Sequence, residues 1–355
     1  MNVLIQTSFV GDSILSLPTI YRLMELSSDN LVIVAAPRNL DLFQLALSRG
    51  LSPFSNRIQI VSWDKRGEHR GFFSFFELRR KILEKFPGEM IENVFCLQRS
   101  FRSGFLAWIL RAKRVIGFSS GAASFFYSDN VPRSWDQGEH ELNKNLSLLR
   151  AVFAEADLTW SSKTALSILA SSQIKVRGGG PIVSLSLGSP WPTKRWDMTQ
   201  ALELCRDLLK KGVTLRLLGD GTTAELYSVI KEQLASPLLE DYSGKTTVSE
   251  WVKLIEESDV LLSGDSAAVH VASDLNRPVI ALFGPTVPEL GFAPWRRSGA
   301  HALGLEMACR PCDIHGPRNC PLGHHNCMKK LSSEIVLKRV ESCLDGVSQK
   351  DYSIQ

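Results

Sequence analysis

The chain is organised around the stretch SDVLLSGDSAAVHVASDLNRPVIALFGPT, residues Ser258–Thr286. Its pattern predicts a short strand at Val260–Leu262, a helix that ends near Leu275, and a second strand at Val279–Phe283. A strand, a helix and a second strand in this order form the repeating unit of a parallel sheet covered by helices. The stretch therefore predicts an α/β fold.

The turn between this strand and the helix carries the groups of a candidate anion site. Gly264, Asp265 and Ser266 stand where the helix begins, and the unpaired backbone N–H groups of a helix start favour a negative charge. His270 follows Ser266 by four residues and so shares its helix face. The alternative is a helix capped by Asp265 or Ser266 beside an ordinary structural histidine. Taken together, the four residues favour an anion site.

Length and composition indicate a two-domain protein without membrane spans. A chain of 355 residues is longer than one hydrophobic core usually supports. A net charge of +4 is too small to indicate nucleic-acid binding, although it suits a polyanion or a membrane surface. No apolar run reaches the roughly 18 residues that span a bilayer, and Met1–Gln6 resembles a strand rather than a signal peptide. We expect a cytoplasmic protein that is at most peripheral to a membrane.

Strand-like and helix-like runs alternate along the whole chain, apart from a Gly- and Ser-rich interruption at 169–181. We expect two doubly wound domains, residues 1–172 and 173–330, and a last helix within 331–355. The expected strands, besides the two above, are Val3–Gln6, Leu31–Ala35, Ile58–Val61, Asn93–Leu97, Arg114–Gly117, Ile182–Leu187 and Val213–Leu218. Because parallel sheets bind ligands at the carboxyl ends of their strands, we expect a site in a cleft between the domains.

Two loops that follow predicted strands carry reactive side chains. Asp12 comes after the first strand, where its carboxylate could take a proton from an acceptor hydroxyl or could cap the next helix. Thr193 and Lys194 follow the strand Ile182–Leu187, and a hydroxyl beside a cation suits a diphosphate. For this second loop the alternative is a solvated basic pair, Lys194 and Arg195.

The sequence GDGTTA at Gly219–Ala224 matches the G-x-G-x-x-A fingerprint of dinucleotide-binding proteins. The match follows the second predicted strand of its domain, whereas the fingerprint normally follows the first strand. Glu225, just inside the next predicted helix, could instead accept hydrogen bonds from the hydroxyls of a ribose. An acidic residue that only favours the helix start is the alternative.

Four of the seven cysteines cluster within nineteen residues, at Cys309, Cys312, Cys320 and Cys327. The first two form a C-x-x-C pair, but the second two are too widely spaced for a regular zinc ribbon. We favour a loop packed by free thiols over a structural zinc site, and we expect no other metal site.

Residues Arg70–Lys81, RGFFSFFELRRK, combine four phenylalanines with a basic cluster. Aromatic side chains beside cations can enter an anionic membrane surface. Phenylalanines more often belong to a hydrophobic core, so a core position is favoured here.

Three longer stretches resemble the lipopolysaccharide heptosyltransferases, and among them the type called heptosyltransferase II. These stretches are SFVGDSILSLPTIYRL (Ser8–Leu23), LGSPWPTKRW (Leu187–Trp196) and SGDSAAVHVASDLNRPVIALFGP (Ser263–Pro285). Weaker similarity at Leu97–Gly104 and His140–Glu141 extends the resemblance over nearly the whole chain. It implies the GT-B fold, in which two Rossmann-like domains face a cleft. The N-terminal domain would bind the acceptor, the C-terminal domain the nucleotide sugar, and the last helix would cross back to the first domain.

The resemblance also implies a reaction, the transfer of heptose from ADP-heptose to the inner core of lipopolysaccharide at the inner face of the inner membrane. Asp12 would be the catalytic base and Lys194 would contact the diphosphate. Ser100 and Arg102 would lie on the acceptor side. The donor pocket would be lined by Thr193, Glu225, Gly264, Asp265, Ser266 and His270. One departure is Ala267, where glycine is common in the family.

The residues themselves support this chemistry. Sugar transfer needs a base for the incoming hydroxyl and a cation or dipole for the departing diphosphate. No D-x-D pair occurs in the proposed donor loops, so we expect no required metal or other cofactor. A single in-line displacement would invert the anomeric carbon. The expected partners are the nucleotide sugar and the lipid A-core oligosaccharide, with peripheral contact to the inner membrane and none to nucleic acid.

Other functions stay open at this point. A glycosyltransferase of the same fold could use another nucleotide sugar. A dinucleotide-dependent oxidoreductase would use Gly219, Gly221 and Ala224. A non-catalytic module would bind zinc through the cysteine cluster and take a polyanion as its partner.

Overall fold

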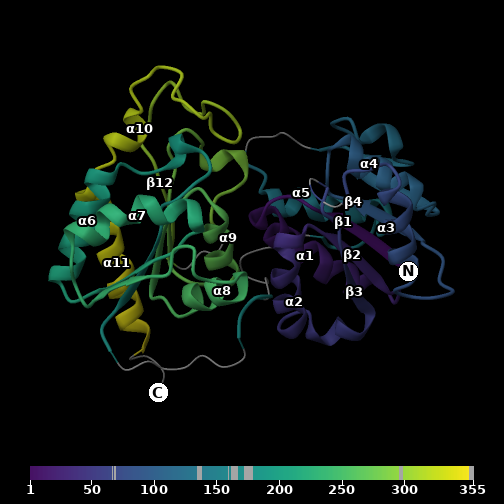
Figure 1. The fold of residues 1–355 in the computed structure, drawn as a ribbon, viewed down its shortest axis with the longest axis horizontal. Helices are drawn as coiled ribbons and strands as arrows, with labels where there is room; N and C mark the ends of the chain where they lie inside the picture. Colours follow the sequence, from purple (N-terminus) through teal and green to yellow (C-terminus); the bar gives the residue numbers. More distant parts are fainter. Residues whose placement is uncertain are drawn as a thin grey trace. The chain divides into compact units, whose positions relative to one another are not determined.

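The computed structural model describes residues 1–65, 67, 69–133, 138–158, 160, 167–171, 179–295 and 299–351, with side chains up to residue 346. The chain divides into two compact units, Met1–Leu169 and Ala170–Gln355, called unit 1 and unit 2 below (Figure 1). The predicted interruption at 169–181 includes residues 172–178, which lie outside the described residues.

Unit 1 contains a six-stranded sheet in the order β3-β2-β1-β4-β5-β6, parallel at every pairing. The strands are β1 (Asn2–Gln6), β2 (Leu31–Ala35), β3 (Ile58–Ser62), β4 (Asn93–Cys96), β5 (Arg114–Phe118) and β6 (Asp129–Val131). In the centre of the sheet, Leu4 is paired with Ile33 on one side and with Phe95 on the other. The direction in which strands are added reverses between β1 and β4, which makes this the switch point where such sheets bind ligands.

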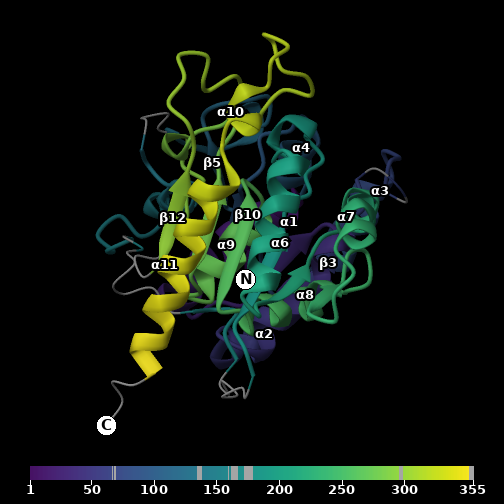
Figure 2. The ribbon, with the colours of Figure 1, turned by 90° about the vertical axis from the view of Figure 1, so that its left-hand side faces the viewer.

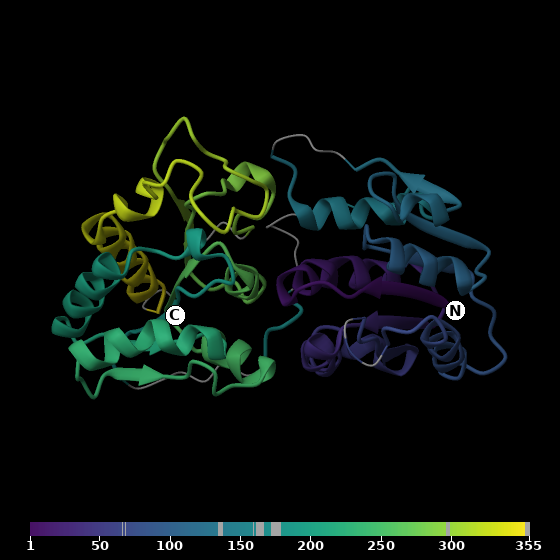
Figure 3. The same ribbon diagram turned by 45° about the horizontal axis from the view of Figure 1, so that its top comes forward.

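Helices cover both faces of this sheet. They are α1 (Val10–Leu26), α2 (Leu40–Ser48), α3 (Ser74–Leu83), α4 (Phe101–Ile109) and α5 (Glu141–Ser147), with 3₁₀ turns η1 (Pro37–Asn39), η2 (Ser52–Arg57), η3 (Ser124–Phe126) and η4 (Leu148–Ala151). The α3 and α4 helices bury Leu78, Ile82 and Leu106 against alternate residues of the central strands, such as Val3 and Ile5. The α1 helix packs against both α2 and α5, and Figure 3 shows purple α1 next to blue-green α5.

Unit 2 repeats the same strand order, β12-β11-β10-β7-β8-β9, again parallel throughout. Its strands are β7 (Ile182–Ser186), β8 (Thr214–Leu217), β9 (Leu239–Asp241), β10 (Val260–Gly264), β11 (Val279–Leu282) and β12 (Ala300–Leu303). The switch point of this sheet lies between β7 and β10. The prediction of two Rossmann-like, doubly wound sheets is therefore confirmed.

The helices of unit 2 are α6 (Met198–Lys210), α7 (Gly221–Gln233), α8 (Val248–Glu256), α9 (Ala267–Asp274), α10 (Asn326–Lys329) and α11 (Ser333–Asp351), with 3₁₀ turns η5 (Pro192–Lys194) and η6 (Pro288–Leu290). Figure 2 shows yellow α11 and teal α6 lying over the sheet. Val336, Val340 and Cys343 of α11 belong to the hydrophobic core of unit 2. The expected crossing of the chain back to the first domain stays a prediction.

Every predicted strand is present, but the pattern missed β6, β9 and β12. These are edge strands of three or four residues, with sequences DNV, LED and AHAL. An edge strand pairs on one side only and tolerates polar residues, so it leaves no apolar run to detect. The β12 strand lies after Thr286, in a segment whose sequence pattern predicts irregular structure.

Two further expectations differ from the structure. The apolar pattern predicts the first helix near Ile14–Ser27, whereas α1 begins at Val10, because the Asp12 carboxylate accepts a hydrogen bond from the backbone N–H of Phe9 and so stabilises an earlier start. At α3, Phe75 is buried as predicted, but the core assignment of Phe72, Phe73 and Phe76 is wrong, since these rings are exposed.

Two loops of unit 2 meet through the buried side chain of Thr223. An added Cβ at Gly188, after β7, would lie 2.3 Å from the Thr223 hydroxyl oxygen, and one at Gly219, after β8, would lie 2.7 Å from its Cβ. Thr223 is 4% exposed, and its hydroxyl donates to Asp220 at 3.0 Å, so the side chain has little room to move. Glycine at these positions lets the two loops approach each other.

We expect Gly188→Ala to destabilise unit 2 by about 1–3 kcal/mol, because the new methyl group overlaps Thr223. Thermal unfolding followed by circular dichroism should show an apparent melting temperature lower by several degrees. Gly221→Ala is the matched control, because an added Cβ there meets nothing within 4 Å and the residue lies in α7. Equal melting temperatures for the two variants would contradict this account.

Candidate functional site

The residues expected to hold an anion come from two neighbouring strands of unit 2. Thr193 and Lys194 lie in η5, in the loop that follows β7, whereas Asp265 and Ser266 follow β10 directly. These strands pair side by side, with Ser186 opposite Ser263, so both loops leave the same edge of the sheet at its switch point. The structure thus brings together groups that are about seventy residues apart in the sequence.

A largely buried ion pair joins the two loops. The Lys194 Nζ lies 2.6 Å from Asp265 Oδ2, and the two side chains are 13% and 9% exposed. The Thr286 hydroxyl donates to the same carboxylate oxygen at 2.8 Å. An ammonium group has three N–H donors, so Lys194 retains donors for a ligand while it is paired with Asp265. The sequence predicted the cation but not its pairing.

The start of α9 lies against this ion pair. Ser266 caps the helix, and its hydroxyl accepts a hydrogen bond from the N–H of Ala268 and lies 2.9 Å from the Ser263 hydroxyl. An added Cβ at Gly264 would lie 3.2 Å from the Lys194 carbonyl oxygen, so this position allows the two loops to come close. A lysine, a capped helix start and two hydroxyls therefore gather at one edge of the sheet.

His270 lies one turn further along α9 and is only 4% exposed. Its ring stacks on Trp295, with the ring centroids 5.8 Å apart and an interplanar angle of 19°. Phe292 also approaches the imidazole, at 6.3 Å between centroids. Sequence reasoning missed both aromatic residues, because they follow η6 in a segment without regular periodicity.

The segment that carries the cysteines packs onto the Lys194 loop. The Thr193 hydroxyl donates to the Pro317 carbonyl, and the Thr193 carbonyl lies 2.8 Å from Nε2 of His325. An added Cβ at Gly316 would lie 3.3 Å from Cε of Lys194. Thr193 is thus held by the later segment, a contact that nothing in the sequence indicated.

The four clustered thiols influence one another electrostatically. Burial raises the pKa of Cys312, and the nearby Cys309 and Cys320 raise it further. The backbone N–H of His325 donates to the sulfur of Cys320 and lowers its pKa. Within the described residues no three His, Cys, Asp or Glu side chains form a group that could hold a metal ion. Zinc binding by this cluster stays an untested alternative.

The dinucleotide-like sequence has a structural role. The Asp220 side chain caps α7 by accepting from the Thr222 N–H at 3.0 Å. Burial opposes ionisation of Asp220, but hydrogen bonds from Thr222 and Thr223 outweigh it and lower its pKa. Glu225 lies in the second turn of α7 and is exposed. The turn follows β8, one strand away from the switch point, which is not the place of a dinucleotide fingerprint.

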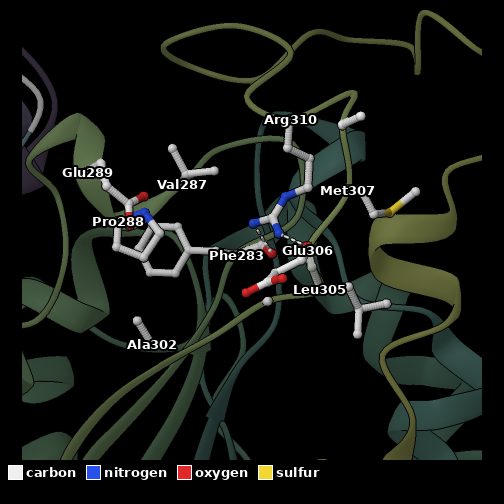
Figure 4. A pocket seen from close by; sticks show the side chains of 11 residues that line it. Phe283, Val287, Pro288, Glu289, Ala302, Leu305, Glu306, Met307 and Arg310 are labelled. Carbon is white, nitrogen blue, oxygen red and sulfur yellow. Dashed lines mark hydrogen bonds between the residues drawn. The ribbon is translucent and has the colours of Figure 1, made fainter.

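A pocket of about 640 Å³ lies between the loops that follow β11 and β12 (Figure 4). Arg310 spans it, and its guanidinium donates to the carbonyls of Phe283 and Thr286 at 2.8 Å each and to those of Gly284 and Leu305. These bonds satisfy most of the guanidinium donors, so Arg310 acts as a clamp rather than as an open anion site. Thr286 connects Arg310 to Asp265, because its carbonyl accepts from Arg310 and its hydroxyl donates to the Asp265 carboxylate.

Asp12 of unit 1 lies at the corresponding switch point, between β1 and β4. Gln6 donates to the Asp12 carbonyl at 3.2 Å and accepts from Gln98, which follows β4, at 2.6 Å. Ser8 donates to Gln98 at 2.8 Å. This polar network fixes the first turn of α1 and with it the position of the Asp12 backbone.

Charged residues that the sequence analysis did not assign to the site interact electrostatically with Asp12. Burial raises the pKa of Glu141, and the ionised Asp12 raises it further, while Arg133 and Lys144 oppose the shift. Arg133 lies 2.5 Å from the Glu141 carboxylate. Burial lowers the pKa of Arg99, with Arg133 adding to that effect and Asp12 opposing it. Arg133 follows the missed strand β6, so its position at the sheet edge was not readable from the sequence.

The two expected acceptor residues are placed differently from each other. Ser100 caps α4 and is exposed, and its hydroxyl lies 2.9 Å from that of Ser103. Arg102 donates to the carbonyls of His69 and Arg70, and its guanidinium lies 5.1 Å from the centre of the Phe75 ring. These contacts hold the turn that precedes α3.

In the part of the chain that the structure describes, no helix combines the length and the apolar character that a membrane span requires. Two parallel Rossmann-like sheets, each with polar groups at its switch point, match the GT-B fold. Residues 79–320 match the model of glycosyltransferase family 9 (heptosyltransferase), and the chain belongs to that family. The predicted family and the enzyme class are thus confirmed.

Individual relatives agree with this membership. The chain is 25% identical over 345 residues to lipooligosaccharide heptosyltransferase 2 of Campylobacter jejuni, covering 94% of this chain and 96% of the relative. It superimposes with a TM-score of 0.73 on the structure of Escherichia coli ADP-heptose lipopolysaccharide heptosyltransferase II, at 20% identity and 99% coverage of both chains. The TM-score is 0.70 for an E. coli heptosyltransferase with ADP, at 17% identity and coverages of 97% and 100%.

We expect Lys194→Met to destabilise unit 2 by about 2 kcal/mol or more, because it leaves the Asp265 carboxylate buried without its cation. The double variant Lys194→Met/Asp265→Asn removes both charges and should lose less stability than Lys194→Met alone. Urea unfolding of wild type, both single variants and the double variant measures the coupling. Additive losses would show that the pair contributes nothing to holding the loops.

Proposed function

We propose that this chain transfers heptose from ADP-heptose to the inner core of lipopolysaccharide. The observation that carries the proposal is the Lys194–Asp265 ion pair at the switch point of unit 2, against the start of α9. Its surroundings combine the charge and the hydrogen-bond donors that a nucleoside diphosphate requires. Family membership and the heptosyltransferase names of the relatives support heptose as the sugar.

Lys194 and the backbone N–H groups at the start of α9 would hold the diphosphate of the donor. Negative charge increases on that diphosphate as the sugar leaves. N–H groups that are already in position therefore stabilise the transition state more than they stabilise the bound nucleotide sugar. Asp265 keeps the ammonium group of Lys194 in place through their 2.6 Å contact. Thr193, Gly264, Ser266, His270 and Glu225 are the further residues that we assign to the donor side.

Asp12 would act as the general base. It would take the proton of the attacking acceptor hydroxyl, whose oxygen forms a bond to the anomeric carbon while the bond to the ADP oxygen breaks. The sugar is thereby inverted in one step. Arg99 supports this assignment, because its guanidinium interacts electrostatically with Asp12 and is a group that suits an anionic acceptor. Ser100 and Arg102 stay the proposed acceptor contacts.

The acceptor would be the lipid A-core oligosaccharide, and the enzyme would act in the cytoplasm at the inner face of the inner membrane. We propose that neither a metal nor any other cofactor is required, since the N–H donors of Lys194 and of the start of α9 would hold the diphosphate in place of a metal. The four cysteines would then serve only packing.

Donor screening tests the function directly. EDTA-treated protein is incubated with ADP-heptose and, separately, with UDP and GDP sugars, each with truncated core lipopolysaccharide. We expect the mass of one heptose to be added to the acceptor only with ADP-heptose, and at the same rate without EDTA. Consumption of a UDP or GDP sugar alone would overturn the heptose assignment, and dependence on added zinc or magnesium would overturn metal independence.

We expect Asp12→Asn to lower the rate of transfer by about 10²–10⁴-fold, because asparagine cannot take a proton. The amide oxygen can still accept from the Phe9 N–H, so the melting temperature should change little. Binding of ADP, measured by calorimetry, should be unaffected. Transfer at more than a tenth of the wild-type rate would rule Asp12 out as the base.

A further inference from the structure

Nine aromatic rings of unit 1 form one connected group, which we call the aromatic surface. Its members come from the start of α3, from α4 and from η3, and they are Phe72, Phe73, Phe75, Phe76, Phe101, Phe105, Trp108, Phe125 and Phe126. Phe105 lies at its centre, with ring centroids 5.7 Å from Phe72, 5.7 Å from Trp108 and 5.8 Å from Phe126. Phe125 and Phe101 join through Phe126, at 5.5 and 4.9 Å.

Most of these rings are open to solvent. Phe125 is 88% exposed and Phe73 84%, and Phe72, Phe76, Phe101 and Trp108 are each at least half exposed. Six of the twelve exposed large apolar residues in the described chain thus lie on this one surface. The core beneath is already filled by Phe75, so the outer rings are not needed to complete it. A contiguous exposed apolar area of this kind indicates an interaction surface.

The segments that carry the rings are strongly basic. Residues 69–86 and 99–126 together contain ten Lys and Arg and two Glu, whereas the whole chain contains 41 Lys and Arg and 37 Asp and Glu. The second segment contains no acidic residue. The cations are Arg70, Arg79, Arg80, Lys81, Lys85, Arg99, Arg102, Arg111, Lys113 and Arg114. Four of them form ion pairs, Arg80 with Glu84, Lys81 with Glu77, Lys113 with Glu92 and Arg114 with Asp129. The rest of the chain is therefore net negative, and the excess positive charge lies in the two segments that carry the rings.

We infer that the aromatic surface docks unit 1 onto a bilayer of anionic phospholipids. The rings enter the boundary between head groups and acyl chains, and the surrounding cations contact the phosphates. Phe and Trp suit this boundary because their large apolar surface is buried there. A second copy of the chain is a poorer occupant, because a two-fold contact through this surface would place cations against cations.

The inference rests on unit 1 alone and does not require the proposed function. If that function holds, the surface also explains how a soluble fold reaches an acceptor that is anchored in lipid. Arg102 then connects the two roles, since its bonds to the carbonyls of His69 and Arg70 fix the turn before α3 that presents Phe72 and Phe73.

Sedimentation with vesicles, without donor or acceptor, tests the inference on the full chain. Wild type should bind vesicles of phosphatidylethanolamine and phosphatidylglycerol, should not bind phosphatidylcholine vesicles, and should bind less as salt is added. Phe73→Ser/Phe125→Ser should weaken binding at least about tenfold. Lys85→Glu, which alters no ring, should weaken it several-fold. Met90→Ser is the matched control, because Met90 is 66% exposed in unit 1 but lies outside the aromatic surface.

Failure of wild type to bind the anionic vesicles would overturn the inference, as would equal binding by the double variant and Met90→Ser. A wild-type dimer that the double variant converts to a monomer in size-exclusion chromatography would overturn it in favour of self-association. Donor screening is independent of this assay, so vesicle binding without heptose transfer would refute only the proposed function, and transfer without vesicle binding only the docking surface.

Discussion

The ion pair between Lys194 and Asp265 is the constraint on which the site of unit 2 depends. It joins two loops that leave neighbouring strands, and it is mostly buried, so its loss would leave a charge in a poorly solvated place. Two neighbouring contacts require the same short distance between these loops. Gly264 lies against the Lys194 backbone, and the Thr286 hydroxyl donates to the Asp265 carboxylate. The strand order brings the two loops together, because it places β7 and β10 side by side.

Much of the fold was predictable because the central strands are buried on both faces. Such strands are continuous apolar runs, as in Leu31–Ala35 and Val279–Leu282, and they are recognised without knowledge of their neighbours. Edge strands such as Asp129–Val131 lack that signal, because their composition is set by solvent and by a single partner strand. The start of α1 was misplaced for a related reason, since Asp12 was interpreted as a possible cap and not as the third residue of the helix.

The candidate site was predictable only where it is local in sequence. Gly264, Asp265 and Ser266 follow directly after one predicted strand, and Lys194 follows another. Their position at the carboxyl edge of the sheet could therefore be inferred. The partners that come from irregular segments could not be inferred. Trp295 against His270, and Pro317 and His325 against Thr193, are contacts between distant parts of the chain, and no periodicity or spacing encodes them.

The stacking of Trp295 on His270 has a practical consequence. Indole emission depends on the immediate surroundings of the ring, and this indole lies 5.8 Å from an imidazole one helical turn away from Ser266. Any molecule that settles at the start of α9 and disturbs the histidine will alter the light that the tryptophan emits. Since the chain contains eight tryptophans, the part of the emission change that is lost in Trp295→Phe would report occupancy of this place without a dye or a radioactive sugar.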